Sequence, residues 1–411
     1  MTAAPPHRTR TMRVLNRVGP ILAPGWPSIR PDDIVRTAVR TSKSNEFGDE
    51  SFMNALPVLF DAITHEAKLN WLGRVMFRQS LLGFLQNRLS IYRHRAAHPE
   101  VVDVPIVRPI FIVGFPRTGT TILFNLLAQD PANRVPMSWE VQFPDPPPTT
   151  ATFLTDPRIE KGRTYFGHMD TMAPSLASIH EVGAELPQEC MPILAQSLLG
   201  PQFNVTFDVP TFQAWVDRQS HAPAYTFHRH YLEHLQSKHM KDRWALKSPV
   251  HLRSLDALLT EYPDARIIFT HRDPAKTVPS LASLIYVIRG LASDSVDPHA
   301  LGQQQLAWWA DSLDQATVAR EKHRDKADQF IDIQFEEVVA DPVAALRRAY
   351  GRFGLPWSEE IERRMRSFLT ENPQGKHGAH HYGLEDFGLD LRQVRDRFEG
   401  YCRAYGVPLV A

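Results

Sequence analysis

The chain has 411 residues, a length that fits two domains or one elaborate domain. Its 43% hydrophobic and 22% charged residues are typical of a globular protein with a sizeable core. Lys and Arg together number 46, as do Asp and Glu, so the chain has no global field to attract nucleic acid or an anionic membrane. We therefore expect no nucleic-acid partner, and any anionic ligand must be bound by a local arrangement of residues.

Cysteine usage and the lack of long apolar runs bear on where the protein works. Cys190 and Cys402 are far apart and form no CxxC pair, which argues against a disulfide framework or a cysteine-based zinc site. Residues 1–13 are polar and lack the apolar segment of a signal peptide. No run approaches the ~18 apolar residues of a membrane-spanning helix. These features predict a cytoplasmic protein with inert thiols and no membrane span.

The first hundred residues are predicted to be helical. Apolar residues recur at helical spacing within residues 34–95. Residues 97–105 then break the pattern with two prolines and acidic residues. We therefore expect a helical N-terminal extension over residues 1–104, followed by a main domain over residues 105–411.

The main domain has the pattern of an α/β fold. Short, continuous apolar runs, typical of strands buried on both faces, alternate with helical segments. Such runs cover residues 110–113 and 266–270, and residues 329–335 are predicted to form a third strand. Strands that alternate with helices predict a central parallel sheet with crossover helices. Residues 140–240 carry mixed signals, and we expect a mostly helical insertion there.

The turn after the first strand has the features of a phosphate-binding loop. A helix that begins near Thr120 offers free backbone N–H groups and the positive end of its dipole. Gly119 lets the backbone approach an anion closely, and the hydroxyls of Thr120 and Thr121 add donors. The spacing resembles that of a Walker A loop, but Thr120 replaces the lysine that reaches the terminal phosphates of a nucleoside triphosphate. Arg117 supplies a cation inside the loop instead. The alternative is an ordinary strand–helix turn that requires glycine.

The string FIVGFPRTGTT, at residues 111–121, resembles the 5′-phosphosulfate loop of sulfotransferases that use 3′-phosphoadenosine-5′-phosphosulfate (PAPS). Many members have Lys where this chain has Arg117, whereas tyrosylprotein sulfotransferases and many bacterial members have Arg. The resemblance spans residues 109–406. It implies a P-loop-like three-layer fold, PAPS as co-substrate, release of the desulfated product PAP, and no metal. The residues implied at the 5′-phosphosulfate are Arg117, Thr118, Gly119, Thr120 and Thr121.

A second cationic site is required for the 3′-phosphate of PAPS. The string RIIFTHRDPAKTVPSLASL, at residues 266–284, resembles the family's 3′-phosphate motif, which would assign this role to Arg272 and Ser280. Arg272 follows a parallel strand, where α/β sheets bind ligands, and its guanidinium fork suits phosphate. The resemblance further implies Lys247 near the transferred sulfuryl group and Lys376 near the 3′-phosphate. A solvated Lys247 is the alternative at that position.

Sulfuryl transfer to an alcohol needs a general base, because a neutral hydroxyl is a poor nucleophile. Related members use a glutamate about twenty residues after the loop, and Glu140 has that offset. We therefore expect Glu140 to be the base, with His180 and Glu189 as rivals. By analogy with phosphoryl transfer, Arg117 and Lys247 would stabilise charge on the leaving nucleotide.

A metal site is not expected from the histidines of residues 221–239. His230 and His234 share one helix face, but Tyr231 occupies the position of the glutamate in a HExxH zinc motif. No set of neighbouring side chains completes a ligand shell.

The acceptor is predicted to be a small molecule with a hydroxyl group. The region around residues 140–240 is rich in aromatic and apolar residues, most of which belong to a core while some line an acceptor pocket. They are Trp139, Phe143, Phe153, Tyr165, Phe166, Met169, Met172, Phe203, Phe207, Phe212 and Trp215. This composition favours a lipid, phenol or sterol-like alcohol. Two alternatives stay open, namely a kinase with a degenerate phosphate loop and a protein that binds PAP without turnover.

Overall fold

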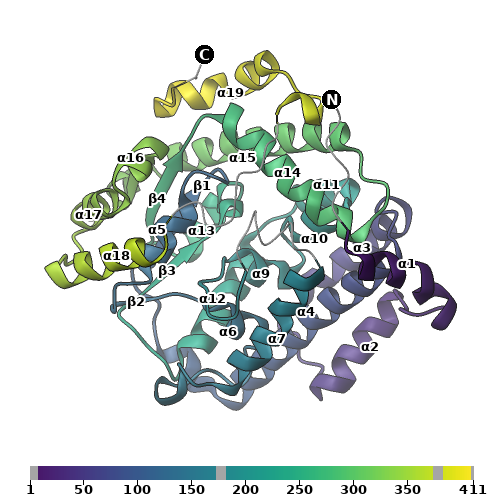
Figure 1. Cartoon of the computed structure of the whole chain (residues 1–411). Helices are drawn as coiled ribbons and strands as arrows, with labels where there is room; N and C mark the ends of the chain where they lie inside the picture. The colour runs from purple at the N-terminus through teal and green to yellow at the C-terminus, as the bar shows by residue number, and fades with distance from the viewer. Residues whose placement is uncertain (1–7, 173–181, 374–382, 409–411) are drawn as a thin grey trace.

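A five-stranded parallel sheet lies at the centre of the protein, between two layers of helices (Figure 1). The computed structural model describes residues 8–172, 182–373 and 383–408. The strands are β1 (Ile110–Gly114), β2 (Asn133–Arg134), β3 (Arg243–Lys247), β4 (Arg266–His271) and β5 (Phe330–Gln334), in the spatial order β2-β3-β1-β4-β5. Every pair of neighbours is parallel. The predicted α/β fold with a parallel sheet is confirmed.

Side chains of the central strand alternate between the two faces of the sheet. Phe111 and Val113 pack on one face with the helices α9 (Met191–Leu194), α12 (Ala222–Gln236), α13 (Leu255–Glu261), α14 (Pro274–Ala292), α15 (Pro298–Lys322) and α19 (Leu391–Tyr405). Ile110 and Ile112 pack on the other face with α5 (Thr120–Leu127), α17 (Pro342–Phe353) and α18 (Glu359–Glu371). Because both faces are covered, β1 is apolar throughout, which is why its sequence predicted a strand.

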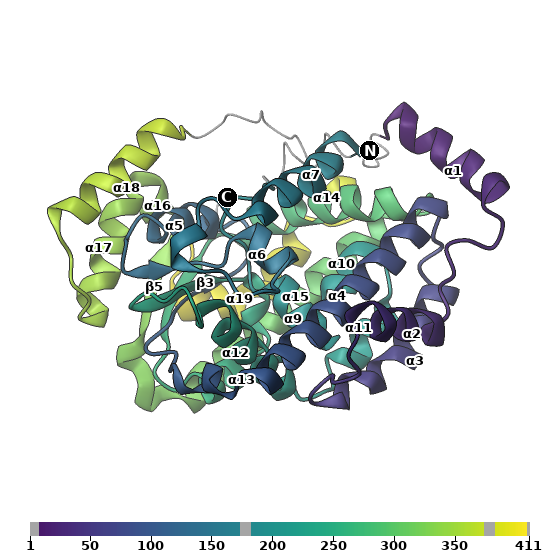
Figure 2. The ribbon, with the colours of Figure 1, turned by 90° about the horizontal axis from the view of Figure 1, so that it is seen from below.

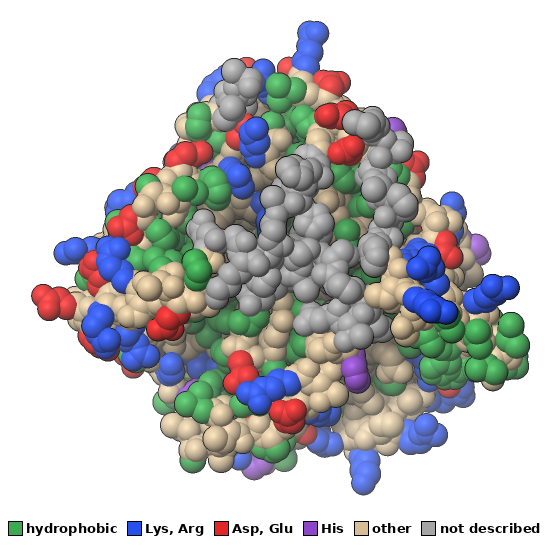
Figure 3. Space-filling view, viewed as in Figure 1, with side chains coloured by type: hydrophobic (Ala, Val, Ile, Leu, Met, Phe, Trp, Pro, Cys, Tyr) green, Lys and Arg blue, Asp and Glu red, His purple; other side chains and the backbone are tan. Residues whose placement is uncertain are grey.

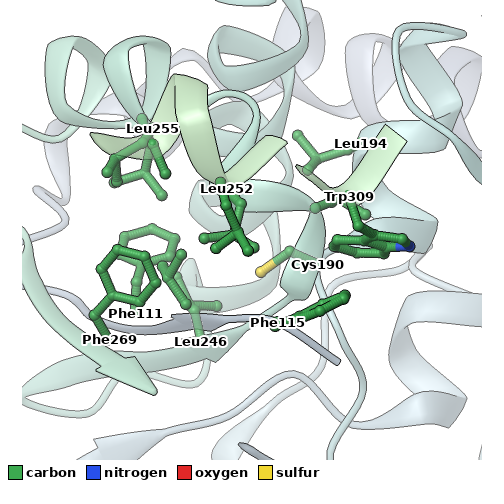
Figure 4. Packing of buried hydrophobic residues seen from close by; sticks show 14 of the residues in the cluster. Phe111, Phe115, Cys190, Leu194, Leu246, Leu252, Leu255, Phe269 and Trp309 are labelled. Atoms are coloured by element: carbon green, nitrogen blue, oxygen red, sulfur yellow. The ribbon is translucent and has the colours of Figure 1, made fainter. Parts of the chain in front are cut away.

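The core beneath the first face contains one of the two cysteines. Figure 4 shows the sulfur of Cys190 among Phe115, Leu252 and Trp309. Burial raises the pKa of the Cys190 thiol far above its usual range, so the group stays protonated. Both cysteines are buried and unpaired, in agreement with the prediction that neither belongs to a disulfide framework.

Three N-terminal helices share a hydrophobic cluster with two helices from later in the chain. They are α2 (Pro31–Ser42), α3 (Ala55–His65) and α4 (Trp71–Ala97), and their partners are α10 (Gln202–Phe207) and α11 (Pro210–Val216). Helix α1 (Arg10–Leu22) packs instead against α4 and α14, where Met12 joins Leu72 and Leu291. Phe77 of α4, for example, lies edge-on to Phe203 and Phe207, with ring centroids 6.1 Å and 5.7 Å away. Figure 2 shows these helices at one end of the molecule and α18 at the other.

The region around residues 140–240 is mostly helical and begins with α6 (Ser138–Gln142) and α7 (Pro157–Met172). The sequence did not predict β2, which has two residues, or β3, which is framed by Arg243 and Lys247. The expectation of a helical extension over residues 1–104 gave no bounds for α1, in which Gly19 and Pro20 interrupt the helical pattern. Within the described residues, no helix combines the length and apolarity needed to cross a bilayer.

Candidate active site

The phosphate loop connects the end of β1 to the start of α5, and it needs glycine at both ends. A Cβ atom on Gly114 would lie 2.1 Å from the Oγ1 atom of Thr270 on β4, so a side chain there would push the two strands apart. Gly119 has φ +83°, and a Cβ atom would lie 2.8 Å from Val338. Arg117 adopts φ +67°, a left-handed conformation that is unfavourable for a residue with a side chain. Backbone strain of this kind is characteristic of functional loops.

The three threonines of the loop have different surroundings. Thr118 is buried, and its hydroxyl donates to the carbonyl of Phe115 at 2.7 Å and lies 2.6 Å from the hydroxyl of Thr270. Thr118 therefore fastens the loop to β4. Thr120 and Thr121, at the N-terminus of α5, line a large cleft together with Arg117 and Gly119. The structure thus brings four of the five predicted 5′-phosphosulfate residues to one wall.

Arg272 reaches the same wall from the end of β4. Its Nη1 atom donates to the carbonyl of Arg117 at 2.7 Å, and its guanidinium lies 3.7 Å above the ring centroid of Phe335, the first residue of α16 (Phe335–Ala340). Two arginines from neighbouring strand ends therefore lie together, as an anion with two phosphate groups requires. Ser280 is 3% exposed in α14 and is absent from the described residues that line the cleft. Lys376 lies outside the described residues.

Lys247 and Glu189 form an ion pair at the end of β3. Lys247 is only 3% exposed, and its Nζ atom contacts the Oε1 atom of Glu189. The Ser248 hydroxyl donates to the other oxygen of this carboxylate at 3.4 Å. The backbone N–H of Cys190 donates to the carbonyl of Lys247 at 2.9 Å, which fixes the turn that carries Glu189. Glu189 lines the cleft together with the phosphate loop, whereas Lys247 is not among the described residues that line it.

Glu140 lies elsewhere, in a buried ion pair. Its side chain is fully buried, and its two oxygens accept hydrogen bonds from Arg134 at 2.8 Å and 2.6 Å. The backbone N–H of Met137 adds a third bond at 2.8 Å. The Arg134 guanidinium lies 4.8 Å from the ring centroids of both Phe153 and Trp244. The structure does not bring Glu140 to the phosphate loop, because both carboxylate oxygens anchor the start of α6. The third candidate for the base, His180, lies outside the described residues.

His228 and His234 of α12 belong to the core. His228 bonds the hydroxyl of Tyr262 at 2.8 Å, and His234 bonds the carbonyl of Pro144 at 3.0 Å. Burial lowers the pKa of both side chains to about 3, so each stays neutral at physiological pH. In the part of the chain that the structure describes, no group of three or more His, Cys, Asp or Glu side chains is arranged to hold a metal ion.

The cleft that begins at the phosphate loop extends into a cavity of about 1640 Å³. A pocket for one small ligand measures roughly 300–1,000 Å³, so this cavity has room for a nucleotide and an acceptor together. The wall far from the loop is apolar and comes from α1, α4 and α14. Its residues are Met12, Leu72, Val75, Met76, Leu284, Ile288 and Leu291.

The aromatic residues predicted for the acceptor pocket divide into two sets. Phe143, Tyr165 and Phe166 line the cavity. Trp139 and Phe203, each 1% exposed, belong to the core. Sequence reasoning missed the apolar residues of α4 and α14, because their spacing is that of any buried helix face.

This fold and site define an enzyme that transfers a group from a nucleotide. The model of the sulfotransferase family matches residues 109–359, more than half of the chain. Curated relatives are the omega-hydroxy-beta-dihydromenaquinone-9 sulfotransferases Stf3 of Mycobacterium bovis and Mycobacterium tuberculosis. Each is 28% identical over 341 residues, which cover 79% of this chain and 81% of the relative.

Two solved structures are similar over nearly the whole chain. The sulfotransferase STF1 of Mycobacterium tuberculosis has 32% identity and a TM-score of 0.81, covering 90% of this chain and 98% of its own. The sulfotransferase STF9 of Mycobacterium avium has 29% identity and a TM-score of 0.85, covering 93% and 99%. The chain belongs to the sulfotransferase family, as its motifs indicated, and it is an enzyme that transfers a sulfuryl group from PAPS. The kinase alternative is therefore not supported.

Proposed function

We propose that the enzyme transfers the sulfuryl group of PAPS to the hydroxyl of an apolar, lipid-like alcohol. The observation that carries this proposal is the continuity of the cavity, which runs from the cationic loop to a wall of Leu, Ile, Val and Met side chains. Burial of apolar surface contributes about 25 cal/mol per Å², so this wall favours a long hydrocarbon over a sugar. The relatives named for a hydroxylated menaquinone support the same acceptor class.

In this proposal PAPS binds across the ends of β1 and β4. The 5′-phosphosulfate lies at the N-terminus of α5 against Arg117, Thr120 and Thr121, where helix dipole and guanidinium attract it. Arg272 binds the 3′-phosphate. Ser280 and Lys376 remain proposals that rest on the motif resemblance.

We assign the general base to Glu189 in preference to Glu140, because the Glu189 carboxylate lines the cleft, whereas Glu140 is fully buried and is not among the described residues that line it. Both carboxylates are ion-paired, Glu189 with Lys247 and Glu140 with Arg134. The acceptor oxygen attacks sulfur and forms the new S–O bond while the S–O bond to the 5′-phosphate breaks in line. The hydroxyl proton passes to Glu189, and the bonding electrons leave with PAP. Arg117 and Lys247 supply the positive charge near the oxygens that become more negative. The proposed reaction uses no metal.

We also infer that the enzyme is cytoplasmic. The two cysteines support this, since neither is in a disulfide and the Cys190 thiol is kept protonated by burial.

Thermal stabilisation by PAP, with ADP and Mg-ATP as controls, tests the donor site. A ligand at about 100 times its Kd adds roughly 2.7 kcal/mol to the free energy of unfolding. We expect PAP to stabilise the protein more than ADP, and Arg272→Ala to remove that difference because the 3′-phosphate loses its cation. Arg324→Ala, which changes an arginine that is 81% exposed on another surface, is the matched control. Stabilisation by Mg-ATP but not by PAP would refute the proposal.

A further inference from the structure

Helix α1 is firmly attached to the rest of the protein by one face. Met12 on this face is fully buried. A Cβ atom on Gly19 would lie 2.4 Å from the ring of Trp71, so the two helices touch at this point. The Asn16 side chain accepts the backbone N–H of Leu72 on α4 at 2.9 Å. The helix is therefore a fixed surface element.

The outer side of α1 exposes large apolar side chains. Val14, Ile21 and Leu22 are 51%, 74% and 78% exposed, and Trp26 follows at 45%. With Leu15, five of the thirteen exposed large hydrophobic side chains on the described residues fall within residues 14–26. Such clustering marks an interaction surface, whereas isolated exposed apolar residues do not.

Basic side chains accompany this apolar surface. Arg10, Arg13 and Arg17 are exposed, and their spacing of three and four residues places them along one strip of α1. None of the three has an ion-pair partner among the described residues, and the first acidic residue of the whole sequence is Asp32. Figure 3 shows hydrophobic and basic side chains side by side at the right-hand edge of the molecule, where Figure 1 draws α1.

We propose that α1 is an interfacial helix that docks the enzyme on a lipid bilayer containing anionic phospholipids. Amphipathic helices with a basic strip and exposed Trp and Leu bind such surfaces by inserting their apolar side chains at the level of the headgroups. The arginines complement the negative charge of the surface, and each raises the partition coefficient by roughly fivefold. A nucleic acid would complement the arginines but leave Ile21, Leu22 and Trp26 exposed to water.

The position of α1 relates this surface to the acceptor. Met12, on the inner face of the helix, packs with Leu72 and Leu291 at the apolar end of the cavity. Docking through α1 therefore brings the hydrocarbon-lined end of the cavity to the membrane, where a lipid-like alcohol is dissolved. This link to the acceptor rests on the proposed function, whereas the docking rests on α1 alone.

The test is sedimentation of the full-length enzyme with vesicles of phosphatidylcholine alone, or mixed with phosphatidylglycerol. We expect binding to the mixed vesicles that weakens at high salt. The triple variant Arg10→Gln, Arg13→Gln, Arg17→Gln should lower the partition coefficient by roughly 100-fold. The pair Ile21→Ser and Leu22→Ser should lower it by roughly tenfold or more, since less apolar surface is buried.

Matched controls replace equally exposed residues elsewhere. They are Arg324→Gln, Arg392→Gln and Arg403→Gln, at side chains 81%, 91% and 76% exposed, and Val318→Ser, at a side chain 69% exposed. Failure of the wild type to bind mixed vesicles, or unchanged binding by the α1 variants, overturns the proposal. So does a dimer that the Ile21 and Leu22 changes dissociate, because this face would then join two copies. PAP stabilisation of each variant shows that it is folded, and it tests the donor site independently of α1.

Discussion

The halves of the cavity that we propose for the donor and for the acceptor are built in different ways. The proposed donor half consists of two short segments, the loop after β1 and the turn after β4, whose side chains are neighbours in sequence. The acceptor half is a cavity whose apolar wall combines residue 12 with residues 72–76 and 284–291. A local motif therefore identifies the donor chemistry, while acceptor choice depends on how distant helices pack. The prediction with the largest expected effect concerns the proposed base, Glu189, which lies where the two proposed halves meet.

Replacing the two candidate carboxylates separates a catalytic from a structural role. Glu189→Gln should lower kcat by about 100- to 10,000-fold, because the attacking hydroxyl loses its proton acceptor, while stabilisation by PAP persists. Glu140→Gln should instead lower the free energy of unfolding by about 3–5 kcal/mol, because Arg134 keeps a buried charge without its partner. Turnover and urea unfolding of both variants give the answer. If Glu140→Gln is folded but has no turnover while Glu189→Gln is active, Glu140 and not Glu189 is the general base.

The two glutamates show why the sequence predicted some parts of the site and not others. The offset of Glu140 from the loop matched a family pattern, but offset does not reveal a partner. Arg134, six residues earlier, takes both carboxylate oxygens once β2 and α6 fold together. Glu189 reaches the site from the segment just before α9, through a turn tied to β3, and no local pattern marks that contact. Arg117 and Arg272, by contrast, lie three residues and one residue beyond the ends of β1 and β4, where the motifs predicted an anion site, and the structure places both on the wall of the cleft.

The same contrast holds for the fold. The strands β1 and β4 were predicted because burial on both faces gives each a run of apolar residues, and β5 was predicted although Asp332 and Gln334 interrupt its apolar residues. The strand β3 has charged residues at both ends, so its sequence resembles a surface segment. The cavity could not be predicted, since Leu284 and Ile288 have the spacing of any packed helix. Only the tertiary structure shows that these two side chains border a cavity.

A larger side chain in the proposed acceptor half tests whether the apolar end of the cavity selects the acceptor. Ile288→Trp places a larger side chain in the apolar end of the cavity, far from Arg117 and Arg272. We expect kcat/KM for a long-chain alcohol to fall by roughly 10- to 200-fold, because hydrocarbon is excluded, with little change for a short alcohol. Stabilisation by PAP should be retained. Val318→Trp, at an exposed position of α15, is the matched control. Equal losses for long and short alcohols would place the acceptor elsewhere.

The smallest expected effect is a dependence of stability on pH that arises in α12. The pKa of His228 and that of His234 are lowered to about 3, whereas an unfolded histidine titrates near 6.5. Between these values the unfolded chain binds a proton at each site and the folded chain does not, so stability falls as the pH drops below about 6.5. Each histidine adds a slope of up to about 1.4 kcal/mol per pH unit.

Urea unfolding above and below pH 6.5 measures this slope directly. The variant His228→Gln should lose the bond to Tyr262 at every pH and have a shallower slope, because one proton-binding site is gone. His65→Gln, at a side chain that is 69% exposed, should leave the slope unchanged. If His228→Gln has the wild-type slope, His228 is protonated in the folded protein, and the acid sensitivity comes from another part of the molecule. A shallower slope instead shows that part of the acid sensitivity arises in α12, outside the two segments proposed to bind PAPS.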